Sequence, residues 1–293
     1  NKLFEEGGVL FAHGFDNLRK KYHVREFEQA ICKKTNVKYA LAVTSGTAAI
    51  KIGLKSLGVK KNDEVITQAF NFIATIEAIL DIGAKPVLVD IVNTLNMCPN
   101  SLIKSINKKT KAIIPVHMLG VPAKMDKILK ISKKFKIPLL EDNCEALGAR
   151  YKNKYLGTIG DVGAISFDGG KIITCGEGGI ILTNNKNIEK YSREYHDHGH
   201  ENNPKLPRGR DSKSIFGFNY RMTEMQGVIG KVQLKKLDKI ISENKKRYNK
   251  LLVLLNKIVD LREIPKNSSP IYDTFILFVT NKYSKKKFNK IIK

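Results

Sequence analysis

The order of apolar and polar positions along the chain predicts a regular succession of helices and strands. Apolar residues recur at helical spacing in segments at 24–34, 71–82, 125–135 and 188–195, and in a helix that begins near Ser45. Short apolar runs, which are typical of buried strands, lie at 39–44, 64–67, 85–91, 111–118 and 137–142. This alternation predicts an α/β fold in which helices cover both faces of a mainly parallel sheet. Ligands of such sheets gather at the carboxyl ends of the strands.

The last part of the chain follows a different pattern. Thr223 and Gln226 form a capping-box signature at the start of a long amphipathic helix. After this helix, 265–270 resembles a linker and 272–279 a strand. We therefore expect a large domain over 1–222, followed over 223–293 by a connecting helix and an incomplete small C-terminal α/β domain.

Composition restricts the class of protein. The net charge of +24 raises the possibility of a basic nucleic-acid-binding regulator. Residues 231–293 hold much of this charge, but their lysines alternate with apolar residues at helical spacing, which favours the solvated face of a helix. No apolar run approaches the roughly 20 residues that span a bilayer, and the four cysteines form no C-x-x-C pair. We therefore expect a cytoplasmic protein without a membrane segment. We also expect no metal, because His196, His198 and His200 match no common zinc spacing.

Three features suggest chemistry. Lys171 follows two glycines between apolar runs, where it could bind a phosphate or form a covalent bond. Ile172 follows it where a P-loop has Ser or Thr, so the phosphate-loop motif fails. Ser45 begins a helix directly after a strand, which suits either a simple N-cap or an anion site. Asp142 ends a buried strand, where it either caps a following helix at 144–149 or pairs with a cation.

Pyridoxal phosphate requires these three groups together. Its phosphate needs a helix N-terminus, its pyridinium nitrogen a carboxylate, and its aldehyde an amine. The order of the helix start, Asp142 and Lys171 therefore predicts this cofactor.

The sequence resembles the DegT/DnrJ/EryC1/StrS sugar aminotransferases, which are fold type I enzymes that depend on pyridoxal phosphate. The resemblance extends from about Phe11 to about Ile258. It rests on the motifs at 44–49, 70–75, 141–148, 166–167, 171–179 and 219–222. Some relatives carry histidine in place of the lysine and catalyse dehydration, so Lys171 implies transamination.

The resemblance also implies roles for individual residues. Lys171 would hold the cofactor as an aldimine, which becomes pyridoxamine phosphate in the half-reaction, and Asp142 would bind the pyridinium. The remaining cofactor contacts implied are Gly46, Thr47 and Ser166 at the phosphate, Phe72 on the ring, Glu145 near O3′, and Asn219 at the phosphate of a neighbouring subunit. Glu145 stands where many members have Gln. The role of Asn219 implies a homodimer with shared sites.

The implied reaction moves an amino group from glutamate or glutamine to a keto-sugar used for surface polysaccharide or lipopolysaccharide. The acceptor would be a nucleotide-linked keto-sugar or, as the run 195–204 suggests, an 8-keto-3-deoxy-octulosonate. Arg208 and Arg210 would suit the anionic group of either acceptor, and Tyr220 and Arg221 are further substrate candidates. An inactive, truncated family member is the alternative to an active enzyme.

Overall fold

A single large sheet organises the protein in the computed structural model, which describes residues 2–5, 21–201, 203, 206, 210–255 and 259–278. Its strands are β1 (Tyr39–Val43), β2 (Glu64–Gln68), β3 (Lys85–Val89), β4 (Thr110–Ile114), β5 (Leu140–Asp142), β8 (Val162–Ser166) and β9 (Gly179–Thr183). A four-stranded part, β1-β9-β8-β5, and a three-stranded part, β3-β2-β4, meet where Ile113 pairs with Leu139 and Val116 with Asp142. The strand order is therefore β3-β2-β4-β5-β8-β9-β1, in which β9 alone runs antiparallel to its neighbours. The predicted mainly parallel α/β fold is confirmed.

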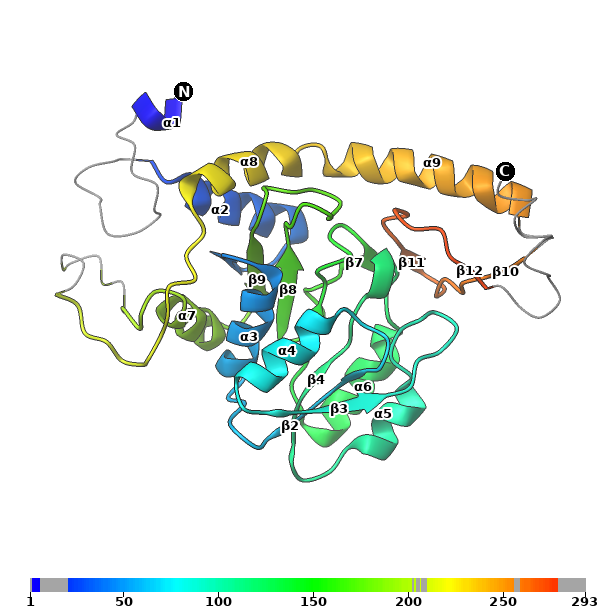
Figure 1. Cartoon of the computed structure of the whole chain (residues 1–293), viewed down its shortest axis with the longest axis horizontal. Helices are drawn as coiled ribbons and strands as arrows, with labels where there is room; N and C mark the ends of the chain where they lie inside the picture. Colours follow the sequence, from blue (N-terminus) through cyan, green and yellow to red (C-terminus); the bar gives the residue numbers. More distant parts are fainter. Residues whose placement is uncertain are drawn as a thin grey trace.

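Helices cover both faces of this sheet (Figure 1). The helices of the large sheet region are α2 (His23–Thr35), α3 (Gly46–Ser56), α4 (Ile73–Asp81), α5 (Pro99–Ser105), α6 (Met125–Phe135) and α7 (Lys186–Tyr195), with a 3-10 turn η1 (Met118–Gly120). A short helix, α1 (Lys2–Glu5), precedes them. Successive side chains of β9 enter different cores: Ile181 packs with α3 and α4, whereas Ile180 and Leu182 pack with α2. A strand buried on both faces has to be apolar throughout, which is why these strands read as continuous apolar runs.

Two glycines allow α8 (Glu224–Leu234) to pack closely on α2. A Cβ on Gly227 would lie 2.8 Å from the backbone nitrogen of Val24, and one on Gly230 would lie 2.6 Å from the Phe27 ring. The buried Glu224 carboxylate accepts from the Val24 N–H, so the first turn of α8 caps the start of α2. The predicted capping box of Thr223 and Gln226 is confirmed.

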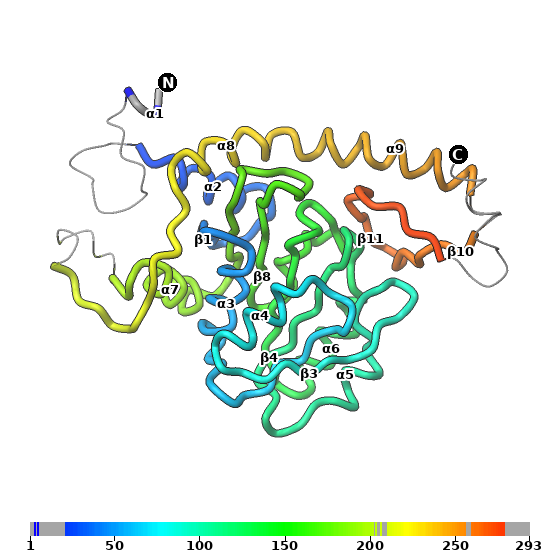
Figure 2. The backbone as a smooth tube through the Cα atoms, viewed as in Figure 1, coloured from blue at the N-terminus to red at the C-terminus, as the bar shows by residue number. Residues whose placement is uncertain are grey.

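The chain after α8 folds back toward the large sheet. The expected single long helix is interrupted after Leu234, and α9 (Leu237–Leu255) continues along the upper side of the molecule. The segment 259–278 then runs beneath α9 (Figure 2), where the Tyr248 ring lies 5.3 Å from the Tyr272 ring. Its strands are β10 (Asp260–Leu261), β11 (Ser268–Ser269) and β12 (Leu277–Phe278). Of the strand expected at 272–279, residues 272–276 are not in a strand, and residue 279 lies outside the described residues. β11 extends the small hairpin formed by β6 (Arg150–Tyr151) and β7 (Lys154–Tyr155).

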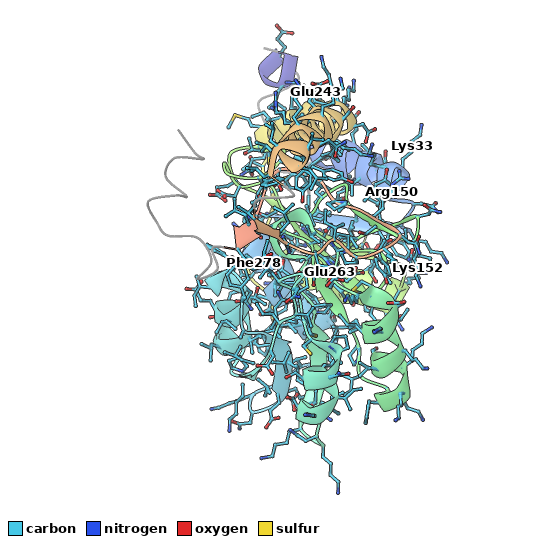
Figure 3. All side chains as sticks on the ribbon, turned by 90° about the vertical axis from the view of Figure 1, so that its right-hand side faces the viewer. Lys33, Arg150, Lys152, Glu243, Glu263 and Phe278 are labelled. Carbon is cyan, nitrogen blue, oxygen red and sulfur yellow. The ribbon has the colours of Figure 1, made fainter. Side chains whose placement is uncertain are left out.

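Charged side chains lie on the outside of this body. Lys33 and Lys152, for example, are exposed on α2 and on the hairpin (Figure 3). On α9, Lys245 and Lys246 are exposed whereas Tyr248 is buried, which confirms the amphipathic pattern read from the sequence. Within the described ranges, no helix is both long and apolar enough to cross a membrane.

Candidate cofactor and catalytic site

Asp142 lies at the carboxyl end of β5 and is almost completely buried. The Thr75 hydroxyl donates to its Oδ2 at 2.7 Å, and the Cys144 N–H donates to its Oδ1 at 3.1 Å. A buried carboxylate is costly without such donors, so these two contacts offset part of that cost and fix its orientation.

The helix expected at 144–149 does not form, so the alternative in which Asp142 caps that helix is wrong. These residues form successive turns, and Gly148 has a left-handed φ of 95°, which interrupts any helix there. The Cys144 contact is therefore local to a turn, and Asp142 remains available to a ligand at the strand end.

Lys171 lies in the loop that joins β8 to β9. Its backbone N–H donates to the Asp168 carbonyl at 3.0 Å. Its Nζ is 3.8 Å from Glu145 Oε1 and 5.9 Å from the centre of the Phe72 ring, which immediately precedes α4. About one fifth of the Lys171 side chain is exposed, so the amine can be reached from solvent.

Glu145 is held beside Lys171 by the turn at 118–120. Its Oε2 accepts from the Leu119 N–H at 2.8 Å, and Leu119 itself has a left-handed φ of 50°. Arg262, from the segment after α9, donates to the Met118 carbonyl at 2.6 Å and to the Leu119 carbonyl at 3.4 Å. Burial lowers the pKa of Arg262 to about 10. The C-terminal segment thus supports the turn that orients Glu145.

The start of α3 and the end of β8 come together beside Asp142. Ser45 accepts from the Ala48 N–H at 3.1 Å, so it is the N-cap of α3. A Cβ on Gly46 would lie 2.8 Å from Ser166 Cβ and 2.9 Å from Cys144 Sγ, so only glycine fits here. The N-terminal N–H groups and dipole of α3 make this junction suitable for an anion as well.

The thiol of Cys144 lies within this site. Burial, followed by the negative charge of Asp142, raises the pKa of Cys144 well above its usual range. A raised pKa favours the protonated thiol at neutral pH, which is the less nucleophilic form.

Four further residues were expected to bind the cofactor or the substrate, and their contacts in the single chain are as follows. Asn219 is exposed and accepts from the Arg221 N–H at 3.4 Å; Thr47 is partly exposed in the first turn of α3. Tyr220 accepts from Lys51 Nζ at 3.0 Å, and Arg221 forms an ion pair with Asp197.

Arg208 and Arg210 were expected to bind the anionic group of the acceptor. Arg210 is exposed, and Arg208 lies outside the described residues.

Two other kinds of site were considered besides the surroundings of Lys171: a metal cluster and a surface hollow. Among the described residues, no group of three or more His, Cys, Asp or Glu side chains could hold a metal ion. A polar hollow of about 400 Å³ lies between the hairpin and β11. It is lined by Arg150, Lys152, Asn153, Asn267, Ser268 and Ser269. It contains none of the residues predicted for the cofactor.

Sequence reasoning missed several residues that shape the site. Thr75 belongs to the motif at 70–75, but its bond to Asp142 joins residues 67 positions apart and could not be read from local spacing. Leu119 contributes its backbone N–H to Glu145, and the Arg262 guanidinium donates to the Met118 carbonyl. Because both contacts involve backbone groups, no pattern of side chains in the sequence reveals them. His117 and Glu141 form a buried pair next to Asp142.

The residues present fit pyridoxal phosphate. An oriented, buried carboxylate suits its ring nitrogen, a helix start at a glycine suits its phosphate, and an accessible lysine suits its aldehyde. The exposed Phe72 ring near Lys171 offers a surface for stacking.

Comparison with known proteins gives the same assignment. Residues 14–293 match the model of the DegT/DnrJ/EryC1/StrS aminotransferase family. The chain is 35% identical over 257 residues to a GDP-perosamine synthase of Escherichia coli O157:H7, covering 87% of this chain and 68% of that protein. It is 40% identical over 214 residues to the GDP-perosamine synthase of Caulobacter vibrioides, covering 73% of this chain and 56% of that protein.

A solved structure of similar fold contains the cofactor. The fold is similar, with a TM-score of 0.82 and 32% identity, to an E. coli GDP-4-keto-6-deoxy-D-mannose-3-dehydratase with bound hydrated pyridoxal phosphate. The match covers 92% of this chain and 75% of that structure.

Proposed function

Because the chain belongs to the DegT/DnrJ/EryC1/StrS aminotransferase family, we propose that it transfers an amino group to a keto-sugar. The family includes pyridoxal-phosphate-dependent sugar aminotransferases such as the GDP-perosamine synthases, and the fold is that of fold type I enzymes. The chain spans 68% and 56% of the lengths of the two GDP-perosamine synthases, so the activity of the whole enzyme is part of this proposal.

One observation carries the proposal: the accessible Lys171 amine lies beside the Phe72 ring at the same sheet edge as the buried Asp142. Thr75, one turn along α4 from Phe72, donates to Asp142 and so connects the two sides of the site. This arrangement offers a base, a stacking surface and a carboxylate to one flat, aromatic ligand.

Each group then has a separate task. When bound, pyridoxal phosphate supplies an electron-withdrawing ring that stabilises a carbanion next to the transferred nitrogen. Asp142 would bind the protonated ring nitrogen, and its two hydrogen-bond donors keep its carboxylate in the orientation that this contact requires. Lys171 Nζ would bond the aldehyde at rest and move a proton during transfer. Gly46 and Ser166 would border the phosphate, with Thr47 beside them, and Glu145 would lie near O3′.

For the acceptor, we propose a nucleotide-linked keto-sugar. Two relatives at 35% and 40% identity are GDP-perosamine synthases, which supports this class over the 8-keto-3-deoxy-octulosonate that the run at 195–204 suggested. The amino donor is glutamate or glutamine, and the product would enter surface polysaccharide or lipopolysaccharide synthesis. Assaying the purified protein with glutamate against both acceptors distinguishes them: activity only with the octulosonate would contradict this choice.

We also propose that the enzyme is a cytoplasmic homodimer with shared sites. Two large apolar side chains are exposed in the single chain: Phe72, beside Lys171, is 62% accessible, and Phe218 is 52% accessible. Asn219, which follows Phe218, would reach the neighbouring subunit. Mixing Lys171→Ala with Asn219→Ala chains should restore part of the activity if sites are shared. If the mixture stays as inactive as its components, each subunit works alone.

The Lys171→Ala variant tests the function directly. It should lose both the visible absorbance of the covalently bound cofactor and transamination, whereas Lys130→Ala, at an exposed position of α6, should keep both. Persistence of the covalent band in Lys171→Ala would refute the assignment. Cofactor binding by the unaltered protein without transfer to either acceptor would support the inactive alternative.

A further inference from the structure

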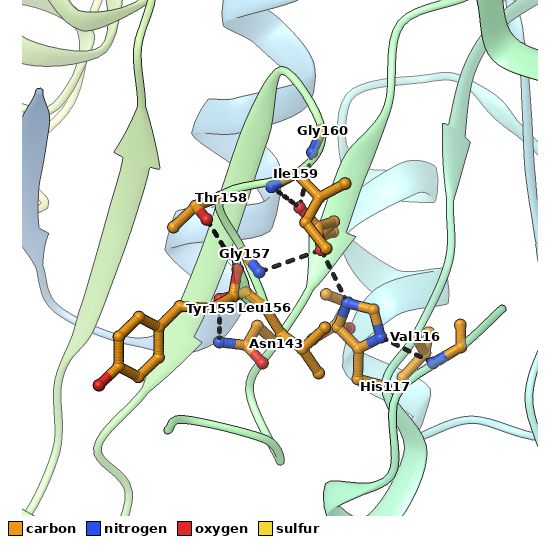
Figure 4. Close-up of polar contacts among 12 residues, drawn as sticks. Val116, His117, Asn143, Tyr155, Leu156, Gly157, Thr158, Ile159 and Gly160 are labelled. Carbon is orange, nitrogen blue, oxygen red and sulfur yellow. Dashed lines mark hydrogen bonds and ion pairs between the residues drawn. The ribbon is translucent and has the colours of Figure 1, made fainter. Parts of the chain in front are cut away.

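Next to Asp142, a second carboxylate is buried and has no task in the proposed reaction. Glu141 precedes Asp142 on β5 and is fully inaccessible to solvent. Four donors surround its two oxygens (Figure 4): the N–H groups of Gly157 at 3.1 Å, Ile159 at 2.6 Å and Gly160 at 2.7 Å, and His117 Nε2 at 3.0 Å. This number of donors satisfies the charged carboxylate without any contact to solvent.

His117 contacts both residues of the Glu141–Asp142 pair. Its Nδ1 accepts from the Ala123 N–H at 3.2 Å, which places the ring proton on Nε2, facing Glu141. Its backbone N–H donates to the Asp142 carbonyl at 3.0 Å. One histidine, itself fully buried, therefore fixes the side chain of Glu141 and the main chain of Asp142.

The same contacts extend to the other side of the cofactor site. The loop at 157–160, bound by Glu141, leads directly into β8, whose last residue is Ser166. A Cβ on Gly163 of β8 would lie only 2.1 Å from the Gly157 carbonyl oxygen, so loop and strand are pressed together. A shift of Glu141 would therefore move β8 as well as β5.

A charged network of this kind is poorly explained by stability alone. Removing a carboxylate from water costs free energy that its partners only offset, and apolar side chains of similar size often serve stability equally well. What the network adds is a single geometry, because four directional bonds allow the carboxylate only one position.

We propose that Glu141 and His117 are positioning residues that set the orientation of Asp142 toward the cofactor nitrogen. They act from the opposite face of β5, because neighbouring side chains on a strand point to opposite sides. This inference rests on the proposed function, since the cofactor reports the position of Asp142.

The test compares His117→Phe with Leu102→Ala, a fully buried change in α5 that removes core packing without touching Asp142. Both variants should melt at lower temperature. Only His117→Phe should alter the visible spectrum of bound pyridoxal phosphate and weaken its binding, by roughly tenfold or more. His117→Gln, whose amide can still donate to Glu141, should restore most of the affinity.

A double-mutant cycle decides whether His117 acts through Asp142. If it does, adding His117→Phe to Asp142→Asn should weaken cofactor binding little further, because the contact it supports is already lost. Additive losses, or an unchanged spectrum and affinity in His117→Phe, would overturn the inference. Should His117→Phe not fold, Glu141→Gln takes its place in the cycle with Asp142→Asn, because it weakens the same contacts from the side of the acceptor. Failure of the unaltered protein to bind pyridoxal phosphate would instead refute the proposed function.

Discussion

Replacing Thr75 by Val tests how far the orientation of Asp142 controls cofactor binding. The Thr75 hydroxyl is buried and donates to Asp142 Oδ2 at 2.7 Å. Valine has nearly the same shape, so the change removes the donor without leaving a cavity. Asp142 would keep the Cys144 N–H on Oδ1, but Oδ2 would lose a neutral donor in a site that excludes most water.

The expected size follows from the type of bond. A hydrogen bond to a charged group contributes about 1.5–3 kcal/mol, and 1.36 kcal/mol corresponds to one decade in an equilibrium constant. If the loss falls fully on the contact between Asp142 and the ring nitrogen, pyridoxal phosphate should bind about 10- to 150-fold more weakly.

The assay is a titration of cofactor-free protein with pyridoxal phosphate, followed by visible absorbance. Thr75→Ser keeps the hydroxyl and should bind nearly as the unaltered protein does. Thr67→Val is a matched control, because Thr67 is equally buried but donates to the Ile114 carbonyl at 2.9 Å. The reasoning is refuted if Thr75→Val binds the cofactor as tightly as Thr75→Ser, or if Thr67→Val weakens binding to the same extent.

Two further predictions concern the helix start and the response to acid. Gly46→Ala places a methyl group 2.8 Å from Ser166 Cβ and 2.9 Å from Cys144 Sγ, so cofactor affinity should fall at least about tenfold in the same titration; unchanged affinity would exclude a tight cradle there. Burial lowers the pKa of His196 from 6.5 to about 4, so between these values the unfolded chain binds a proton that the folded chain does not. Stability should therefore fall as the pH decreases through this window, by at most about 3 kcal/mol from this residue. Urea unfolding at pH 7 and pH 5 should show less acid loss in His196→Gln, and equal losses would contradict the shift.

Strongly periodic segments of the fold could be read from the sequence. The boundaries of α6 coincide with the predicted 125–135, because a clear apolar stripe fixes both ends. The helix expected at 144–149 shows the limit. Its residues suit a helix locally, but the first backbone N–H of the segment, that of Cys144, donates to the side chain of Asp142 instead. The division into domains at residue 222 stays a prediction.

Some residues of the candidate site could likewise be predicted from the sequence, and others could not. Lys171 and Asp142 could be found because each follows or ends a recognisable strand. Thr75 and Glu141 could not, because their partners are set by strand order, and only the bridges between β4 and β5 bring 113–116 beside 139–142. Local patterns name the residues that carry chemistry, whereas the residues that hold them depend on the tertiary fold.

The two adjacent carboxylates of β5 restrict how this segment can change during evolution. Glu141 faces the donors of 157–160, and Asp142 faces the cofactor side. Losing or gaining one residue between Pro138 and Glu141 would exchange the two faces, since a strand alternates with a period of two. Substitutions here can be compensated by neighbouring changes, but a change of length cannot, so insertions and deletions should accumulate in the surface loops and spare this strand.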